Sequence, residues 1–419
     1  MAFTLTAEQQ RWVDVASSLA PDIAKASRRD DEAAAFPTET FALLRKAGLL
    51  NLAVPKQFGG EGPATGNAHL TAYLVTEQVS RACAATGWDL IIHYHQCGAV
   101  ARLGNEEQKR RILGDVVNKG AIMGSLGSEV NHQEQTAAKD ASRKLIFQAE
   151  MAPVKGGFLA NAAKHFCSNA PIADYMLYWS IAPGANAATD GLTLSIVTKD
   201  SPGLTFSRHG WDDIIGLRSS VSWSAKLDNV FIPWDNVLGE PGDFVQKDPY
   251  TLELSQAFHL LGAAQGALDY VVEVLRARPF LQNEEGLMVT LGELSGEVQA
   301  SRGSCLIANA LWEQERFGEA ALASLRAHHT ARETAIHVIT KVFDMVGTRA
   351  LFKTAPLERL WRDVRTASLH TRASQLLRLV ADADVAGQYA PKQKYGALVD
   401  KPKTWADLGF ARELSSAVA

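Results

Sequence analysis

The 419-residue chain lacks the features that mark several common classes of protein. It has only four cysteines, at positions 83, 97, 167 and 305, and no CxxC pair, which argues against a zinc knuckle and favours a reducing compartment. No window holds a long run of Lys or Arg, and the net charge is −4, so neither nucleic acid nor an anionic membrane is expected as a partner. The most apolar stretch, 257–268, is too short to span a bilayer, and the first ten residues do not resemble a signal peptide. We therefore expect a cytoplasmic protein.

Motifs for several enzyme classes are missing as well. There is no GxxxxGK[ST] phosphate loop, no GxSxG elbow and no HExxH, and FGGEG does not have the GxGxxG spacing. His93 and His95 are two residues apart in a predicted helix and would point to different faces, so no metal site is predicted. The composition, with 47% hydrophobic and 21% charged residues, is that of an ordinary globular protein of two to four domains.

Three regions differ in their hydrophobic period. Residues 1–120 are predicted to be helical, beginning at a capping box of Thr6 and Gln9, with a later helix between Pro37 and Gly48. Residues 121–241 alternate with a period near two in KLIFQAEM, FLANAAKHF, ADYMLYWSIA, GLTLSIVTK and WSAKLDNVFIP, which predicts a small barrel or sandwich. Residues 242–419 return to helical spacing. The order helical, β, helical predicts a mostly α, α+β chain of three domains.

Several segments resemble the acyl-CoA dehydrogenase superfamily. These are AGLLNLAVPKQFGGEG, LGNEEQKRRIL, SLGSEV, FLANAAKHFCSNAPIADYMLYW, the stretch 201–242, LLGAAQGALDYVVEVL and PLERLWRDVRTASL. They cover almost the whole chain in the order found in that family. The resemblance implies an N-terminal helical domain, a central β-barrel and a C-terminal four-helix bundle. It also implies a homotetramer with a flavin between barrel and bundle.

The departures from the family pattern bear on the reaction. Dehydrogenases of the family carry YEGT after RD, and that Glu is the base; here RDVRTASLHT places His370 and Thr371 at the Tyr and Glu positions. A second branch keeps its base on the first helix of the bundle, and Glu253 lies one residue from that place. The QxxGGxG segment that helps to seat FAD is DMVGTRA here, which favours FMN while leaving FAD possible.

These changes resemble the flavin monooxygenase branch of the superfamily, and its dibenzothiophene monooxygenase group in particular. That resemblance implies a two-component enzyme that takes reduced FMN from a separate flavin reductase. It would react with O₂ through a C4a-hydroperoxyflavin and oxygenate a small aromatic or sulfur-containing, or nitrogen-containing, substrate.

The same resemblance implies roles for particular residues. Ser168 would bond flavin N5, Phe166 would lie against the isoalloxazine, and the segment from Leu126 to Ser128 would bind the pyrimidine edge. A turn or strand Ser, and an ordinary core Phe, are the structural alternatives.

Two histidines are the candidate catalytic groups. His370 follows an apolar Leu in a loop that closes over the flavin in relatives, where its imidazole could donate a proton near neutral pH. His93 would lie at the mouth of the active site; a core or capping histidine is the alternative for both. Arg278 would bind the flavin phosphate of a neighbouring subunit, and Arg349 or its rival Lys353 would be a second phosphate ligand. Three aromatic residues would form an apolar substrate slot: Trp88, Tyr94 and Phe258.

Two other functions remain open. An acyl-CoA dehydrogenase would bind FAD and use Glu253 or another carboxylate as its base. A non-catalytic relative would keep the fold as a binding module and would have no affinity for flavin.

Overall fold

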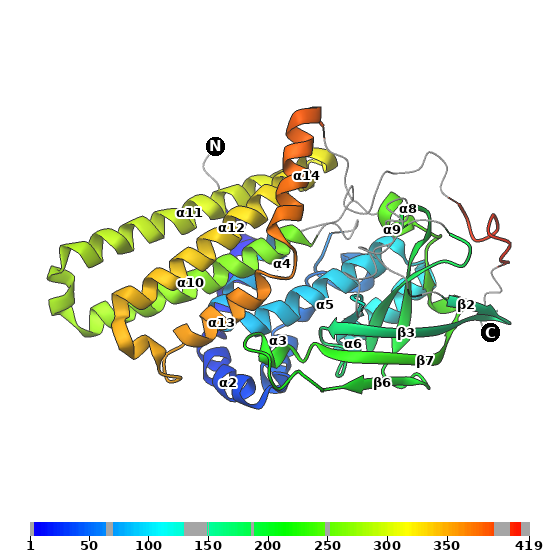
Figure 1. The fold of residues 1–419 in the computed structure, drawn as a ribbon, viewed down its shortest axis with the longest axis horizontal. Helices are drawn as coiled ribbons and strands as arrows, with labels where there is room; N and C mark the ends of the chain where they lie inside the picture. Colours follow the sequence, from blue (N-terminus) through cyan, green and yellow to red (C-terminus); the bar gives the residue numbers. More distant parts are fainter. Residues whose placement is uncertain are drawn as a thin grey trace.

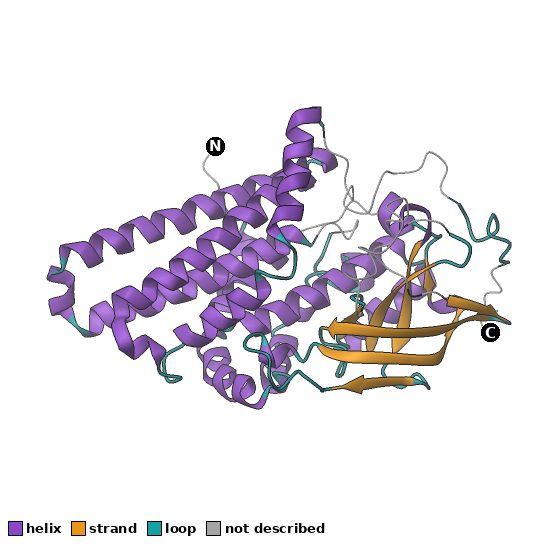
Figure 2. Cartoon of the chain, in the orientation of Figure 1, coloured by secondary structure: helices purple, strands orange, loops and turns teal. Residues whose placement is uncertain are grey.

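The computed structural model describes residues 4–63, 70–129, 149, 151–185, 188–247, 252–388 and 403–411. Helices and strands are segregated along the chain and in space: the sheets lie at one end of the molecule and the long helices at the other (Figures 1 and 2). This is the predicted order of a helical region, a β region and a second helical region.

The N-terminal region is built from helices whose ends the sequence specifies. Thr6 and Gln9 form the predicted capping box, and Asn105 with Gln108 forms a second one at the start of a later helix. Gly48 ends the third helix region with φ 76°, which suits a residue without a Cβ. The elements are α1 (Ala7–Ser18), α2 (Ala20–Ala33), α3 (Thr38–Lys46), η1 (Leu49–Asn51), η2 (Lys56–Phe58), α4 (Leu70–Ala82), α5 (Ala84–Leu103) and α6 (Glu106–Lys119).

The β region forms two four-stranded sheets, with strand orders β1-β4-β5-β8 and β2-β3-β7-β6. The described strands therefore make two separate sheets and not the closed barrel that the family resemblance implied. The strands predicted in 158–166, 173–182, 191–199 and 223–233 are confirmed, while most of KLIFQAEM lies outside the described residues. The elements are β1 (Met123–Leu126), β2 (Met151–Val154), β3 (Gly157–Cys167), β4 (Tyr175–Ile181), α8 (Ala188–Gly191), β5 (Leu192–Thr198), β6 (Leu204–Ser207), η3 (Arg218–Ser220), β7 (Trp223–Pro233), η4 (Trp234–Asn236), β8 (Val237–Leu238) and α9 (Asp243–Gln246).

Three long helices, of 25, 29 and 30 residues, form the C-terminal bundle, and two shorter ones complete it. None of the described helices is both long and apolar enough to cross a membrane. The elements are α10 (Glu253–Ala277), η5 (Pro279–Asn283), α11 (Glu285–Glu313), α12 (Phe317–Val346), η6 (Gly347–Leu351), α13 (Leu357–Ala367) and α14 (Ala373–Ala386).

One hydrophobic core joins the N-terminal helices to the bundle, and α5 links that core to the sheets. The first half of α5 packs in the helical core, whereas Cys97 and Val100 in its second half pack with residues of the sheets. Glycines allow the close approach of α4 to its neighbours. A Cβ at Gly87 would lie 1.9 Å from Ser80 Oγ, and one at Gly262 would lie 2.2 Å from the Glu77 carbonyl oxygen. This close packing places the start of α5 beside α10.

The C-terminal segment departs from the predicted domain boundary at 242. Trp405 is 1% exposed and packs with Phe158 and Trp234 in the core of the sheets, and its indole N–H donates to the Gly239 carbonyl at 3.1 Å. Figure 1 shows this last part of the chain at the end of the molecule that holds the sheets. The 403–411 segment therefore belongs structurally to the β region, because Trp405 packs in an aromatic cluster whose other members lie far from it in the sequence.

Candidate active site

Trp88, near the start of α5, lies between the sheets and the bundle and touches both. Its indole N–H donates to Ser168 Oγ at 3.1 Å, and its ring meets the ring of His370 edge-on, with centroids 5.1 Å apart. The Asn169 amide also donates to the Asp89 carbonyl at 2.9 Å, which ties the end of β3 to the same turn of α5. Ser168 and His370, two candidates far apart in sequence, thus both contact the Trp88 indole. We call the region formed by Trp88, Ser168 and His370 the junction site.

The end of β3 is irregular at the predicted flavin residues. The pairing of β3 with β7 shifts register between Lys164 and Cys167, and Phe166 within this bulge has φ 52°, a left-handed conformation that is unusual for an aromatic residue. Phe166 is 55% exposed, whereas Ser168 is only 5% exposed. A bulge of this kind redirects a side chain, and here it turns an aromatic ring out of the sheet core beside a buried hydroxyl.

The segment after β1 is bonded to the same end of β3. The Ser125 N–H donates to the Ser168 carbonyl at 3.1 Å, and the His165 N–H donates to the Ser128 carbonyl at 2.9 Å. Leu126 points into the core of the sheets, while Ser128 is exposed. The structure therefore places Leu126–Ser128 beside Ser168, as expected for segments that act together.

A buried lysine fixes this segment. The Lys164 ammonium donates to the Gly127 carbonyl at 3.1 Å, to the Trp179 carbonyl at 2.7 Å and to Glu129 Oε1 at 3.0 Å. Burial lowers the pKa of Lys164, and the adjacent Glu129 carboxylate opposes that shift. An ammonium surrounded by three oxygens holds the loop after β1 in one position.

Two serines that sequence reasoning missed extend the polar contacts of Ser168. Ser222 Oγ lies 2.7 Å from Ser168 Oγ and 2.8 Å from Ser220 Oγ, so three buried hydroxyls form a continuous chain. The signal was available in GLRSSVSWSA, where four serines stand within six residues just before a strand.

The loop that carries these serines is held by the bundle. Leu217 and Val221 adopt φ 53° and 41°, and the Leu217 N–H donates to Asp363 Oδ1 of α13 at 2.6 Å. Burial, helped by nearby Asp31, raises the pKa of Asp363 to about 7. Burial also raises the pKa of Asp89, and Asp363 adds to that shift. Two buried acids thus lie behind the junction site.

The bundle meets the junction site at Gln256 on α10. Its side-chain nitrogen lies 2.9 Å from His370 Nδ1, in the turn after α13. His259, one turn further along α10, also contacts Trp88, with ring centroids 5.8 Å apart. Burial lowers the pKa of His259 to about 3, so this ring is neutral. Glu253, the alternative base, is 2% exposed and lies one turn before Gln256.

His93 does not have the surroundings predicted for a catalytic residue. Its Nε2 lies 3.0 Å from the Leu50 carbonyl, and its Nδ1 accepts the Met123 N–H at 3.1 Å. The ring is fully buried, and burial lowers its pKa to about 4. Because both nitrogens serve backbone groups, His93 joins η1, α5 and β1, and a contact with peroxide or substrate stays a prediction that these bonds do not support.

The predicted aromatic slot is not assembled either. Tyr94 donates its hydroxyl to the Leu49 carbonyl in the helical core, and Phe258 is fully buried and stacks on Tyr73, with centroids 5.5 Å apart. Only Trp88 of the three predicted residues lies at the junction site. The other two pack in the core because large aromatics at helical spacing stabilise helix–helix contacts.

The two predicted phosphate ligands lie far from the junction site of their own chain. Arg278 caps the end of α10, 22 residues or about 33 Å along the helix from Gln256. Arg349 is in η6, beyond the end of α12, and Figure 1 shows both helix ends at the end of the bundle remote from the sheets. Within one chain, neither can reach a flavin held at Ser168.

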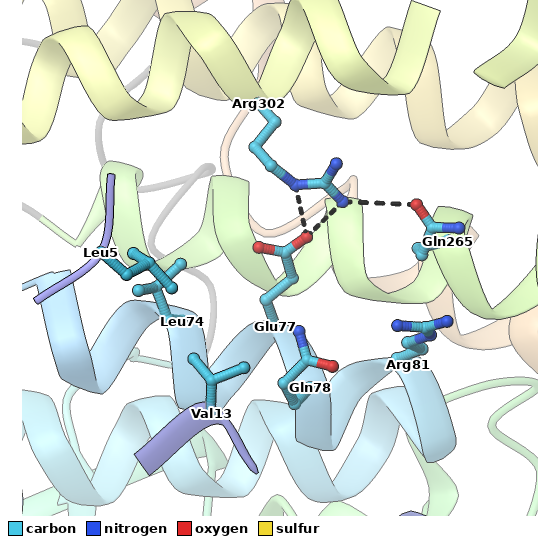
Figure 3. A pocket seen from close by; sticks show the side chains of 8 residues that line it. All are labelled: Leu5, Val13, Leu74, Glu77, Gln78, Arg81, Gln265 and Arg302. Carbon is cyan, nitrogen blue, oxygen red and sulfur yellow. Dashed lines mark hydrogen bonds and ion pairs between the residues drawn. The ribbon is translucent and has the colours of Figure 1, made fainter. Parts of the chain in front are cut away.

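A separate hollow of about 350 Å³ lies between α1, α4, α10 and α11 (Figure 3). Its polar wall is an ion pair in which the Arg302 Nε–H donates to Glu77 Oε1 at 2.8 Å, with Gln265 alongside. None of the junction-site residues lines it. No cluster of three or more metal-ligating side chains occurs in the part of the chain that the structure describes.

Comparison with known proteins identifies the family. Two family models match: "Acyl-CoA dehydrogenase, N-terminal domain" over residues 6–120 and "Acyl-CoA dehydrogenase, C-terminal domain" over residues 254–375, together more than half of the chain. Cyclohex-1-ene-1-carbonyl-CoA dehydrogenase of Geobacter metallireducens is 26% identical over 388 residues, covering 90% of this chain and 97% of the relative. Dibenzothiophene monooxygenase of Rhodococcus erythropolis is 27% identical over 406 residues, covering 90% and 94%.

Solved structures show the same fold. FMN-bound TdsC from Paenibacillus sp. A11-2 superposes with a TM-score of 0.78 at 24% identity, covering 92% of this chain and all of that one. Butyryl-CoA dehydrogenase from Megasphaera elsdenii superposes with a TM-score of 0.81 at 21% identity and the same coverage. The chain belongs to the acyl-CoA dehydrogenase superfamily and is a flavin-dependent oxidoreductase.

Proposed function

We propose that the protein is a two-component flavin-dependent monooxygenase that uses reduced FMN and O₂. One observation carries the proposal: at the turn after α13, the side chain that faces α10 is His370, and its partner there is the Gln256 amide, 2.9 Å away. A dehydrogenase needs a carboxylate to remove the substrate α-proton, and an amide cannot act as that base. An imidazole near a flavin suits a reaction that needs a proton delivered.

The residues at the junction site fit a flavin. A flavin is a flat apolar ring system with a polar edge, and the site offers an exposed Phe166 ring beside the buried Ser168 hydroxyl and the segment Leu126–Ser128. These residues would hold the flavin ring. When bound in its reduced form, the flavin would supply the two electrons with which O₂ is divided between an oxygenated product and water.

The chain's own residues have separable tasks in this proposal. His370 would donate a proton at the reacting oxygen, and the hydroxyl chain from Ser168 to Ser222 would bond the central ring of the flavin. Trp88 fixes the relation between these two groups, because it contacts both, and it is only 4% exposed. Its bulk would help to exclude water, which protects reactive oxygen species from wasteful decay.

The choice of cofactor and partners extends the same proposal. FMN is favoured by the DMVGTRA segment and by the FMN-bound form of the structural relative TdsC. A separate flavin reductase would supply the reduced flavin, and the substrate would be a small aromatic, sulfur- or nitrogen-containing molecule. The site would be used in the cytoplasm by a homotetramer, in which Arg278 could serve a neighbouring subunit's flavin.

An FAD-dependent acyl-CoA dehydrogenase is the second candidate. The relative from Geobacter metallireducens favours it, because its 26% identity is nearly equal to that of the monooxygenase relative. In that case Glu253, one turn from Gln256 on α10, would be the base.

Replacement of His370 tests the proposal. The wild-type protein and the His370→Ala variant would be supplied with reduced FMN by a flavin reductase, with O₂ and with indole or dibenzothiophene as probes. We expect the variant to oxidise reduced flavin to H₂O₂, while product per flavin falls by about 10²- to 10⁴-fold. Full, coupled turnover by the variant would contradict the assignment.

A further inference from the structure

The contact between Gln256 and His370 bears on which nitrogen of the imidazole carries the hydrogen. A carboxamide nitrogen has hydrogens to donate and no acceptor, so at 2.9 Å His370 Nδ1 must be the acceptor. A neutral imidazole carries its single hydrogen on the other nitrogen when one nitrogen accepts. In its neutral form, His370 would therefore carry that hydrogen on Nε2.

Other contacts hold the same ring. The Thr371 hydroxyl lies 3.4 Å from Nδ1 on the same side as the amide, and a hydroxyl can also donate there. Trp88 packs edge-on with the ring, and the His370 backbone N–H donates to the Ala367 carbonyl at 3.0 Å, which fixes the turn that carries the ring. The imidazole is thus held by groups from α5, α10 and its own turn.

The exposure of the two partners differs in a way that suits control of one by the other. Gln256 is 2% exposed and is packed within α10, whereas His370 is an exposed residue in a turn. A buried amide has few alternative partners and loses little rotamer freedom when it bonds the ring. The buried member therefore sets the state of the exposed one.

We propose that Gln256 is a positioning residue that keeps His370 in its Nε2–H tautomer, so that the ring presents a hydrogen-bond donor to what binds at the junction site. The tautomer follows from the chain's own contacts; its use in oxygen transfer rests on the proposed function. Gln256 acts only through His370.

The direct test is ¹⁵N NMR of protein labelled in histidine, recorded at a pH where the ring is neutral. The spectrum of His370→Gln identifies the signals of His370 by difference. We expect wild-type Nδ1 to give the signal of an unprotonated ring nitrogen and Nε2 that of a protonated one. A protonated Nδ1 in the wild-type protein would overturn the proposal without any variant of Gln256.

Two substitutions reverse or remove the control. In Gln256→Glu the carboxylate accepts a hydrogen, so the Nδ1 signal should become that of a protonated nitrogen. In Gln256→Leu the donor is lost, and a mixture of tautomers is expected. Gln265→Leu, nine residues along the same helix and bonded to Asp269 at 3.2 Å, is the matched control and should leave the His370 signals unchanged. Wild-type signals in both Gln256 variants would contradict the proposal.

Activity separates this inference from the proposed function. With reduced FMN, O₂ and a substrate that the wild type oxygenates, Gln256→Glu should lower product per flavin by about tenfold or more, since misoriented catalytic histidines lose activity on that scale or beyond. If the NMR result holds and the wild type with reduced FMN and O₂ forms no oxygenated product and no long-lived flavin species, the proposed function fails and the tautomer assignment stands. If the wild type couples flavin oxidation to product formation but Nδ1 is protonated, the proposed function stands and the tautomer assignment fails.

Discussion

Two histidines, His93 within α5 and His370 beside it, each lie in a cluster of polar contacts, and their ring nitrogens bond different kinds of partner. In the helical core, both nitrogens of His93 bond backbone groups, at 3.0 Å to Leu50 and 3.1 Å to Met123. At the junction site, His370 bonds a side chain, Gln256, and packs against another, Trp88. The first ring is fully buried and the second is exposed.

The difference separates a histidine that holds backbone groups from the one that we propose as the proton donor. A ring that satisfies two backbone groups is required for their hydrogen bonding and cannot change protonation without breaking one of those bonds. A ring whose Nδ1 is bonded by a side chain can be positioned by that side chain. Substitutions in the two clusters should therefore have different effects.

The largest effect is expected for His93→Leu. The change leaves the Leu50 carbonyl and the Met123 N–H buried without their partner, which should cost about 2–6 kcal/mol of unfolding free energy. Urea denaturation measures it. His370→Leu is the matched control and should cost less, about 1–3 kcal/mol, because its ring is exposed and only the buried Gln256 amide loses a partner. Equal losses in both variants would remove the distinction between the clusters.

The pH dependence of stability should report the helical core. Burial lowers the pKa of His93 to about 4, below the value near 6.5 expected in the unfolded chain. The unfolded state then binds more protons, so this contribution is complete above pH 6.5 and is lost as the pH falls towards 4, by up to about 3 kcal/mol. The difference between the unfolding free energies at pH 7 and pH 5 should be smaller in His93→Gln than in the wild type. An unchanged difference would show that another group carries it.

A smaller effect is expected for Trp88→Phe, which removes the N–H to Ser168 and keeps an aromatic ring. Stability should fall by about 0.5–1.5 kcal/mol. Trp312→Phe is the matched control, since its indole donates to Ser324 Oγ at 2.9 Å in the bundle core. Both variants should lose similar stability, but only Trp88→Phe should weaken binding of reduced FMN, by about fivefold for 1 kcal/mol. Titration with reduced FMN measures the affinity of each variant. Equal affinities in Trp88→Phe and Trp312→Phe would place the flavin away from Ser168.

The smallest effect is expected for Glu253→Gln. In the proposed monooxygenase this carboxylate has no chemical step, so oxygenated product per flavin should change by less than about threefold. A dehydrogenase that used it as the base would lose about 10²-fold or more in acyl-CoA oxidation. Steady-state rates of the two reactions in this variant distinguish the two functions.

The sequence predicted the elements better than the contacts. The capping box at Thr6 and the four strands follow from local patterns, whereas Phe166, Ser168 and His370 are predicted from their places in family motifs. The partner of His370 was not found, because Gln256 lies 114 residues away and stands in an apolar run that indicates only a buried helix.

Local patterns failed where burial decides the role of a residue. His93 has the same chemistry as a catalytic histidine, and the two backbone groups that it bonds, 43 and 30 residues away, could not be identified from the sequence. Trp405 resembled part of a helical domain, but an aromatic cluster in the sheets binds it. Such contacts join distant segments and leave no periodic signal.

Anaerobic mixing of the protein with photoreduced FMN, followed by rapid mixing with O₂, shows without any substrate whether the protein is a flavin-dependent monooxygenase. We expect a long-lived absorbance distinct from both reduced and oxidised flavin, and this absorbance should decay faster in His370→Ala. Immediate return to oxidised flavin in the wild type, together with bleaching of bound FAD by an acyl-CoA without O₂, would contradict this expectation and establish a dehydrogenase.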